Sequence, residues 1–334
     1  GKSGEDRKLF QETDFSGRIM VPFCPESRLS GVFHTDFMPA VWYQKRLPLK
    51  VPDNGSLLLH FGAVDYYCTV WMNGELVGEH RGGYSSFTLD ITNFVKDGEN
   101  NLVIRAEDDP RSGLQPRGKQ SPNYFSKGCS YTRTTGIWQT VWIERVPQDY
   151  ICSVQYYPNI AENSLTVEAQ VNGEGILKAQ ASYKGRACGN AQAQSTGPVV
   201  AITIPLSEAH LWEPGHGRLY DLELFFGEDH VKSYFGMREI CIKGEKMLIN
   251  GKSVFQRLIL DQGYYPDGIY TAPSDADLEK DIQLAMEAGF NGARLHQKIF
   301  EPRYLYHCDR LGYLVWGEHG SWGLDYSSPK ALKI

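Results

Sequence analysis

A short apolar segment near the end of the sequence is followed by side chains that could bind a polar ligand. Residues 313–316, Tyr-Leu-Val-Trp, have the composition of a short buried strand. Glu318, His319 and Trp322 come directly after it. A carboxylate, an imidazole and an indole together offer hydrogen-bond acceptors, donors and a flat apolar surface. We therefore expect a ligand site where this strand ends.

Two earlier strand-like segments also end in polar residues. Residues 254–260 and 290–295 are rich in apolar side chains. The carboxyl ends of parallel strands meet at one edge of a sheet, where α/β proteins place their ligands. The candidate ligand-contacting residues at the three strand ends are Asp261, Gln262, Arg294, His296, Glu318 and Trp322. Arg294 could equally be a buried structural arginine, and a histidine at a strand end could contact ligand or only protein.

The segments between these strands have the pattern of helices. Ser274 is a good N-cap, and Asp277 places negative charge in the first turn. Gly289 suits the left-handed residue that ends a helix. A second helix is expected to begin at Pro302 and to end at Gly312. The resulting strand-helix-strand-helix-strand order predicts parallel strands.

A long segment without regular periodicity spans residues 108–133. Loops of this length inside a domain are usually functional or disordered. Arg117 and Lys119 make it a candidate to reach over a neighbouring site, and we add both to the substrate-binding candidates. The alternative is a solvated loop without a binding role.

The rest of the chain reads as β-structure. Before residue 147, short strands alternate with Gly and Asn turns, and Asn73-Gly74 is a strong two-residue hairpin signal. This predicts a jelly-roll sandwich. Period-two alternation in the next ninety residues predicts an immunoglobulin-like sandwich. We expect domains at 1–147, 148–237 and 238–334.

The bulk composition is that of an ordinary globular protein. The chain of 334 residues has a formal net charge of −6, which offers no electrostatic footprint for nucleic acid or an anionic membrane. No apolar run approaches the length of a membrane span, and the N-terminus lacks the apolar core of a signal peptide. The seven cysteines contain no CxxC and indicate free thiols. We expect a cytoplasmic protein, with export as an alternative if a signal was removed.

Several motifs, in order along nearly the whole chain, resemble glycoside hydrolase family 2, which includes β-galactosidases, β-glucuronidases and β-mannosidases. The segments VWMNGELVGEHRGGYSSFTLDIT, GENNLVIRAEDDP and YTRTTGIWQTVWIE resemble its N-terminal jelly roll. LWEPGHGRLYDLEL resembles the end of its immunoglobulin-like domain. FGMREICIKGEKMLINGKSVFQRLIL resembles the entry into its catalytic (β/α)8 barrel. The resemblance implies a multidomain, mainly β fold followed by the first βα units of an incomplete barrel.

The resemblance also implies retaining hydrolysis of a terminal β-linked sugar by two glutamates. In this family the acid/base follows an Asn after the fourth barrel strand, and the nucleophile follows the seventh. Neither has a matching position here, so no catalytic residue is assigned and we expect the chain alone to be inactive. Asp261-Gln262 and Ser130 depart from the residues of β-galactosidases, and His296 lies one residue early. The parent enzyme is still expected to be β-galactosidase-like.

Two other functions remain open. The jelly roll could be a non-catalytic carbohydrate-binding module, or the sandwiches could form an oligomerisation scaffold. We expect a carbohydrate substrate, no nucleic acid or membrane partner, and homo-oligomers as an open alternative. No cofactor is expected. One carboxylate beside one histidine at Glu318-His319 is a weak signal for a divalent metal.

Overall fold

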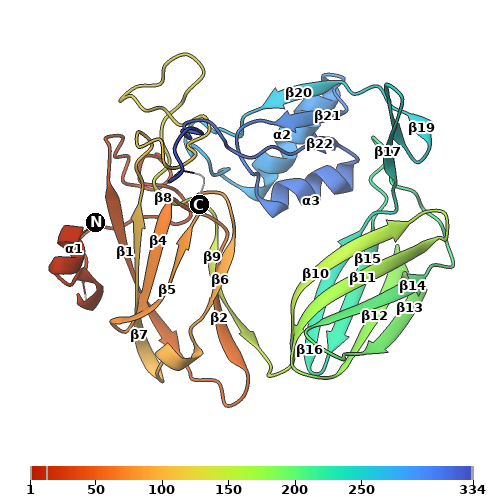
Figure 1. Cartoon of the computed structure of the whole chain (residues 1–334), viewed down its shortest axis with the longest axis horizontal. Helices are drawn as coiled ribbons and strands as arrows, with labels where there is room; N and C mark the ends of the chain where they lie inside the picture. The colour runs from red at the N-terminus through yellow and green to blue at the C-terminus, as the bar shows by residue number, and fades with distance from the viewer. Residues whose placement is uncertain (1, 13, 332–334) are drawn as a thin grey trace.

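The computed structural model describes residues 2–12 and 14–331 and is mainly β. Figure 1 shows two β-sandwiches at the two sides of the molecule, with a part built of parallel strands and helices above them. In the described part of the chain, no helix has the length and apolar character required to cross a bilayer.

The first sandwich contains two larger antiparallel sheets and one strand pair. One sheet has the order β1-β7-β4-β5, the second β6-β2-β9, and β3 pairs with β8. Their bounds are β1 Ala40–Leu49, β2 Ser56–Phe61, β3 Val64–Asp65, β4 Tyr67–Met72, β5 Glu75–Arg81, β6 Phe87–Asp90, β7 Gly98–Glu107, β8 Gly136–Ile137 and β9 Val141–Val146. Three short helices accompany them: α1 Lys2–Asp6, η1 Leu9–Gln11 and η2 Thr92–Phe94.

The hairpin predicted at Asn73-Gly74 joins β4 to β5. Both residues have positive φ, 54° and 86°, as a type I′ turn requires. Between the sheets, Leu59, Phe61 and Val70 are almost completely buried. The apolar inner faces of the strands therefore form the core of this sandwich.

The second sandwich has the alternation that the sequence predicts. Sheets β10-β11-β14 and β13-β12-β15-β16 are antiparallel. The bounds are β10 Tyr150–Asn159, β11 Ser164–Asn172, β12 Ile176–Tyr183, β13 Arg186–Gln194, β14 Val199–Pro205, β15 Tyr220–Phe226 and β16 Asp229–Phe235. Along β15, Leu222, Leu224 and Phe226 are fully buried, while the side chains between them are more exposed. The period of two thus sends one face of the strand into the core.

A small antiparallel sheet forms the connection to the third part. Three short strands, β17 Ile240–Lys243, β18 Lys246–Ile249 and β19 Lys252–Ser253, form a small sheet. The strand predicted at 254–260 begins only at Leu258. The backbone N–H of Val254 donates to Met247, and that of Arg257 donates to the Asn291 side chain. Because these partners lie outside the parallel sheet, the segment before Leu258 is not part of its ladder.

The third part has the predicted alternation of strands and helices. Strands β20 Leu258–Asp261, β21 Gly292–Leu295 and β22 Leu314–Trp316 are parallel and adjacent in that order. Helix α2 Asp275–Glu287 has Ser274 as N-cap, whose hydroxyl accepts from the Asp277 N–H. Helix α3 Pro302–Leu311 ends at Gly312 with φ 75°. Ser274 therefore begins α2 and Gly312 ends α3, as the sequence predicts.

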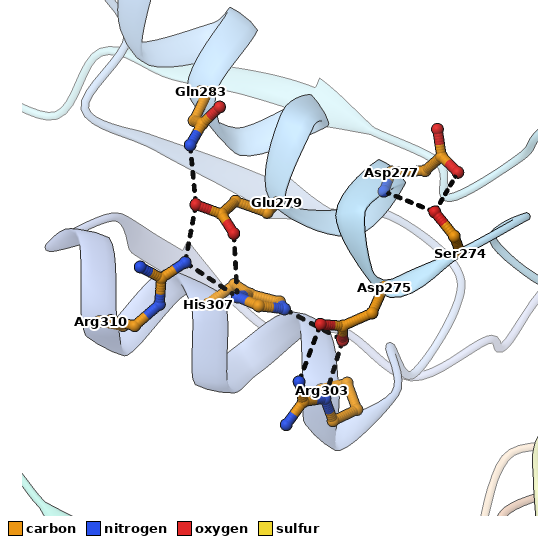
Figure 2. Close-up of polar contacts among 8 residues, drawn as sticks. All are labelled: Ser274, Asp275, Asp277, Glu279, Gln283, Arg303, His307 and Arg310. Carbon is orange, nitrogen blue, oxygen red and sulfur yellow. Dashed lines mark hydrogen bonds and ion pairs between the residues drawn. The ribbon is translucent and has the colours of Figure 1, made fainter.

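Polar contacts join the two helices of this part. Figure 2 shows that Asp275 and Glu279 of α2 point toward the basic side chains of α3. Arg303 donates two hydrogen bonds of 2.8 Å to Asp275, and His307 lies 3.1 Å from the same carboxylate. Arg310 lies 2.7 Å from Glu279. The imidazole of His307 is buried between the helices, so it contributes to their packing as well as to their charge pairing.

The two faces of the parallel sheet have different surroundings. Ala293 and Leu295 pack against α2 and α3 and are almost completely buried. On the opposite face, Leu260, Arg294 and Trp316 are aligned across the three strands and are all about half exposed. The sheet is therefore not covered on both faces.

This part packs on both sandwiches. Tyr270 contacts Trp138 of the first sandwich, with ring centroids 5.1 Å apart, and the Thr271 hydroxyl donates to the Trp138 carbonyl. On the other side, the indole of Trp212 donates to the carbonyl of Asp309 in α3. Trp138 is fully buried, so its ring belongs to the core and is not available as a platform for a sugar.

Candidate functional site

The ends of β21 and β22 bring four polar side chains together. We call Arg294, His296, Gln297 and Glu318 the strand-end cluster. Arg294 donates to the Glu318 carboxylate at 2.7 and 2.8 Å, and Gln297 donates to it through its side chain at 2.9 Å and its backbone N–H at 3.1 Å. The imidazole of His296 lies 3.8 Å from the same carboxylate. Three of the four residues were predicted from the sequence.

The charges of this cluster are set by its neighbours. Burial raises the pKa of Glu318, but the hydrogen bonds from Arg294 and Gln297 outweigh it, and the net pKa lies below its usual value. Burial lowers the pKa of His296, Glu318 opposes this, and Lys119 and Arg294 add to the lowering. At neutral pH the cluster therefore has an ionised Glu318, a cationic Arg294 and a neutral His296.

Gln297 was not among the predicted residues. Its side-chain oxygen accepts the backbone N–H groups of Ser321 and Trp322, at 3.0 and 2.8 Å. It therefore orders the loop after β22 and, at the same time, holds Glu318. A glutamine after a strand gives no distinctive sequence signal, because this role depends on a loop more than twenty residues away.

The long loop of the first sandwich reaches this site. Figure 1 shows it as the yellow segment above β8. The backbone N–H groups of Arg117 and Gly118 donate to the carbonyl of Trp322, at 2.8 and 3.2 Å. A Cβ at Gly118 would lie 2.3 Å from the carbonyl oxygen of Gln297, so this close approach requires glycine. The loop thus closes against both strand ends.

Lys119 and Trp322 lie against each other at the edge of the site, and of the two only Trp322 is substantially exposed. The ammonium of Lys119 lies 3.8 Å from the centre of the Trp322 ring, and the indole is 40% exposed. Trp322 also contacts the His296 ring edge to face, at 5.6 Å. In the described ranges, Lys119 makes no ion pair with a carboxylate, although its side chain is almost completely buried. The ammonium of Lys119 therefore makes a cation–π contact with Trp322.

Asp261 and Gln262 lie apart from the strand-end cluster. The Asp261 carboxylate accepts the Gly263 N–H at 2.8 Å and the Tyr304 hydroxyl at 3.1 Å, so it faces helix α3. Its carbonyl accepts the His296 N–H. Among the described residues, the buried Oε1 atom of Gln262 has no hydrogen-bond partner. Direct contact of Asp261 and Gln262 with a sugar stays a prediction. The hydrogen bonds of Asp261 do not favour it, because they turn its carboxylate toward α3.

A buried lysine supports the loop that bears His296 and Gln297. The Lys298 ammonium donates to the carbonyls of Gly263 and Tyr270, both at 2.7 Å, and lies 5.1 Å from the centre of the Trp138 ring. Burial lowers its pKa to about 8. Lys298 therefore joins two strand-end loops to the first sandwich, and sequence reasoning did not single it out.

The arrangement is suited to binding a polar, ring-shaped ligand. An exposed indole offers a stacking surface, and Arg294, Lys119 and Glu318 offer charged hydrogen-bonding groups. In the part of the chain that the structure describes, no second carboxylate is hydrogen-bonded to this cluster. No group of three or more His, Cys, Asp or Glu there could hold a metal ion. Among the described residues, the strand-end cluster thus contains one carboxylate, Glu318, and not the pair of carboxylates that glycoside hydrolysis uses.

Two family models match the chain in the order of its sandwiches. Residues 27–114 match the model described as "Glycosyl hydrolases family 2, sugar binding domain". Residues 149–238 match the model described as "Glycosyl hydrolases family 2". The first match falls within the first sandwich, and the second covers the second sandwich.

Sequence relatives include glycosidases of two specificities. The chain is 28% identical over 293 residues to a putative β-glucuronidase of Formosa agariphila, covering 83% of this chain and 34% of the relative. It is 25% identical over 313 residues to a β-galactosidase of Thermoanaerobacter pseudethanolicus, covering 86% of this chain and 40% of the relative. The chain thus spans well under half of the length of these two curated relatives.

A solved structure supports the same arrangement of the fold. The β-glucuronidase of Ruminococcus gnavus superposes with a TM-score of 0.81 at 19% identity, covering 99% of this chain and 59% of that one. At this identity the likeness concerns the fold alone. The two family models, matched in order, are the stronger finding. The chain belongs to glycoside hydrolase family 2 and contains its sugar-binding and immunoglobulin-like domains.

Proposed function

We propose that this chain is the substrate-recognition part of a retaining β-glycosidase that hydrolyses terminal β-linked sugars. The contact of the first sandwich with the strand ends is the observation that carries the proposal. Arg117 and Gly118 bond to Trp322, and Lys119 lies over its ring beside the strand-end cluster. Such a surface, formed by two parts of the chain, is typical of a ligand site between domains.

The role of each residue follows from its chemistry. Trp322 would stack on a pyranose face, and Arg294 and Lys119 would donate hydrogen bonds to sugar oxygens. Glu318 would accept from a hydroxyl, and it would also hold Arg294 in place. The parallel strands β20–β22 would be the first strands of a (β/α)8 barrel whose remaining strands supply the catalytic glutamates. These two carboxylates would lie about 5 Å apart, as retention requires.

The test is hydrolysis of aryl β-glycosides (galactoside, glucuronide, mannoside and glucoside) by this chain and by a version extended through its reading frame. We expect only the extended version to hydrolyse one of the four. In that version, Trp322→Ala should raise KM at least tenfold, whereas Trp142→Ala, which removes an exposed tryptophan of β9, should leave KM unchanged. Hydrolysis by the 334-residue chain itself would refute the assignment of the catalytic pair to other parts of the protein.

A non-catalytic carbohydrate-binding role is the second candidate. It is favoured by one observation: the strand-end cluster has a single carboxylate, Glu318, with its hydrogen bonds already satisfied by Arg294 and Gln297. Binding of a sugar by the extended version, without hydrolysis of any of the four glycosides, would favour this role over the enzyme.

A further inference from the structure

A separate cavity lies at one end of the first sandwich. Its volume is about 710 Å³, within the range of small-molecule sites. Residues of β4, β5 and β7 line it, together with the segment before β1 and the beginning of the long loop. It shares no lining residue with the strand-end cluster, nor does it include Arg117, Lys119 or Trp322. It is therefore distinct from the site described above.

Three arginines line this cavity, and none forms an ion pair with a carboxylate in the described ranges. Arg81 lies 5.0 Å from the centre of the Tyr67 ring. Arg111 and Arg133 lie 3.8 and 3.9 Å from the centre of the Phe37 ring. Arg133 is buried and donates to two backbone carbonyls, those of Thr35 and Asn123. Arg81 and Arg111 are exposed, so their guanidinium groups are available to a ligand.

Three acidic residues also line the wall, and one of them, Asp108, interacts electrostatically with Arg133. The carboxylate of Glu107 lies 3.1 Å from the guanidinium of Arg105, a residue that does not line the cavity. Burial raises the pKa of Asp108 well above its usual value, and Gln115 donates to its carboxyl group. The Asp109 carboxylate accepts the backbone N–H of Arg111. With Lys330 also in the wall, the cavity has an excess of positive charge.

Two polar atoms of the wall have no hydrogen-bond partner within residues 2–12 and 14–331. They are the hydroxyl of Tyr66 and the Nε of Arg133, and both are buried. Unsatisfied buried polar groups are uncommon in native proteins and call for an explanation. Because neither atom reaches solvent, neither can contact a ligand in the cavity, and the candidate ligand contacts are Arg81 and Arg111.

We propose that this cavity binds a saccharide bearing an oxyanion, a carboxylate or a sulfate, through the guanidinium groups of Arg81 and Arg111. Guanidinium groups bind both oxyanions through paired, charge-assisted hydrogen bonds. The oxyanion is inferred from the charge of the cavity alone. The saccharide is inferred from the proposed function, since a glycosidase with a second sugar-binding site would hold a polymeric substrate at two points.

The test is calorimetric titration of the full-length protein with glucuronic acid, glucose 6-sulfate, glucose and sodium sulfate. We expect one or both acidic sugars to bind and glucose not to bind. The double variant Arg81→Gln, Arg111→Gln should weaken binding at least about tenfold, because both charged hydrogen-bond donors to the oxyanion are lost. The control Arg145→Gln, at an exposed arginine of β9, should bind as the unmodified protein does. Arg133 stays unchanged because it is buried.

Three results would overturn the inference. Glucose binding as tightly as the acidic sugars would exclude the oxyanion. Sodium sulfate binding as tightly as glucose 6-sulfate would exclude the saccharide. Loss of binding in Lys119→Met, with full binding in the double arginine variant, would place the ligand at the strand-end cluster instead. Hydrolysis of the aryl glycosides is measured separately, so failure of this site and failure of the enzyme assignment are distinguishable.

Discussion

The two β-sandwiches of this chain have the same architecture but very different interiors. In the second, the core is apolar, and Ser164 and Ser195 are the only polar side chains buried among the described residues 149–238. The first sandwich and its loop bury many polar and charged side chains. They include Glu26, Asp65, Arg105, Asp108, Lys119, Gln120 and Arg133.

This difference agrees with the proposal that ligand recognition involves the first sandwich. Burying an ionisable group costs free energy unless its partners compensate, so a sandwich needed only for support would not retain such groups. In the first sandwich they lie beneath the long loop, beside the cavity and beside the contact with the strand ends. The second sandwich has the interior of a spacer that positions the parts around it.

The largest expected effect is the loss of apolar packing in the second sandwich. Phe226→Ala should lower the free energy of unfolding by about 3–5 kcal/mol, because Phe226 is fully buried between the sheets. Phe225→Ala, on the opposite face of the same strand, should cost much less. Urea denaturation of both variants measures the difference. Equal costs would mean that the alternation of β15 does not define this core.

The free energy of unfolding of the first sandwich should instead depend on pH. Burial raises the pKa of Glu26 from 4.5 to about 7, so the folded state holds a proton that the unfolded state has lost. The stability contributed by this group therefore falls as pH rises from about 4.5 to about 7. Glu26→Gln should be more stable than the unmodified protein by roughly 3 kcal/mol at pH 8, and nearly equal to it at pH 4.

Urea denaturation across this pH range measures the effect of Glu26. The exposed Glu162→Gln is the control, and its stability should differ little from that of the unmodified protein at any pH. A Glu26→Gln variant without any gain at pH 8 would show that the buried carboxyl is compensated in its ionised form.

A buried hydrogen-bond network should contribute to the free energy of unfolding of the first sandwich, as apolar packing does in the second. Gln120 donates to Asp65 at 2.6 Å and accepts the Thr134 N–H at 2.8 Å. Gln120→Leu should cost about 2 kcal/mol, because both partners lose their hydrogen bond inside the protein. Gln139→Leu is the matched control, since Gln139 is also buried but its side chain has no hydrogen bond to the described residues. Equal stability of the two variants would contradict the role of the network.

The smallest effect is expected where charge pairs are exposed. The side chains of Arg303 and Asp275 are 61% and 51% exposed, although their pairing is bidentate (Figure 2). Arg303→Gln should cost about 0.5 kcal/mol. Hydrogen bonds from Arg303 and His307 lower the pKa of Asp275, so this contribution is present above about pH 4 and lost as pH falls further. A cost that does not decrease between pH 4 and pH 2 would exclude the ion pair as its source.

Local features of the fold were predictable from the sequence. The Asn73-Gly74 hairpin, the Ser274 N-cap and the Gly312 helix end depend on the conformational preferences of a few neighbouring residues. The parallel order of β20–β22 follows from the alternation of strands and helices. The start of β20 was not predictable, because the bonds of Val254 and Arg257 to residues elsewhere shorten it.

The candidate site was predictable as a set of residue types but not as an arrangement. Strand ends identified Arg294, His296 and Glu318, and the length of the loop suggested Arg117 and Lys119. Nothing local indicated that Gln297 would bond both Glu318 and the Trp322 N–H. The cavity with Arg81, Arg111 and Arg133 also went unrecognised, because these arginines come from distant segments.

By itself, the sequence determined the elements, their caps, the apolar faces of the strands and the family to which the chain belongs. These depend on residue preferences and spacing within short segments. Only the tertiary structure decided which polar groups meet, such as Gly118 against the Gln297 carbonyl and Lys119 over Trp322. These contacts join residues far apart in the chain, and they form because packing the parallel strands on the first sandwich closes the long loop against the strand ends.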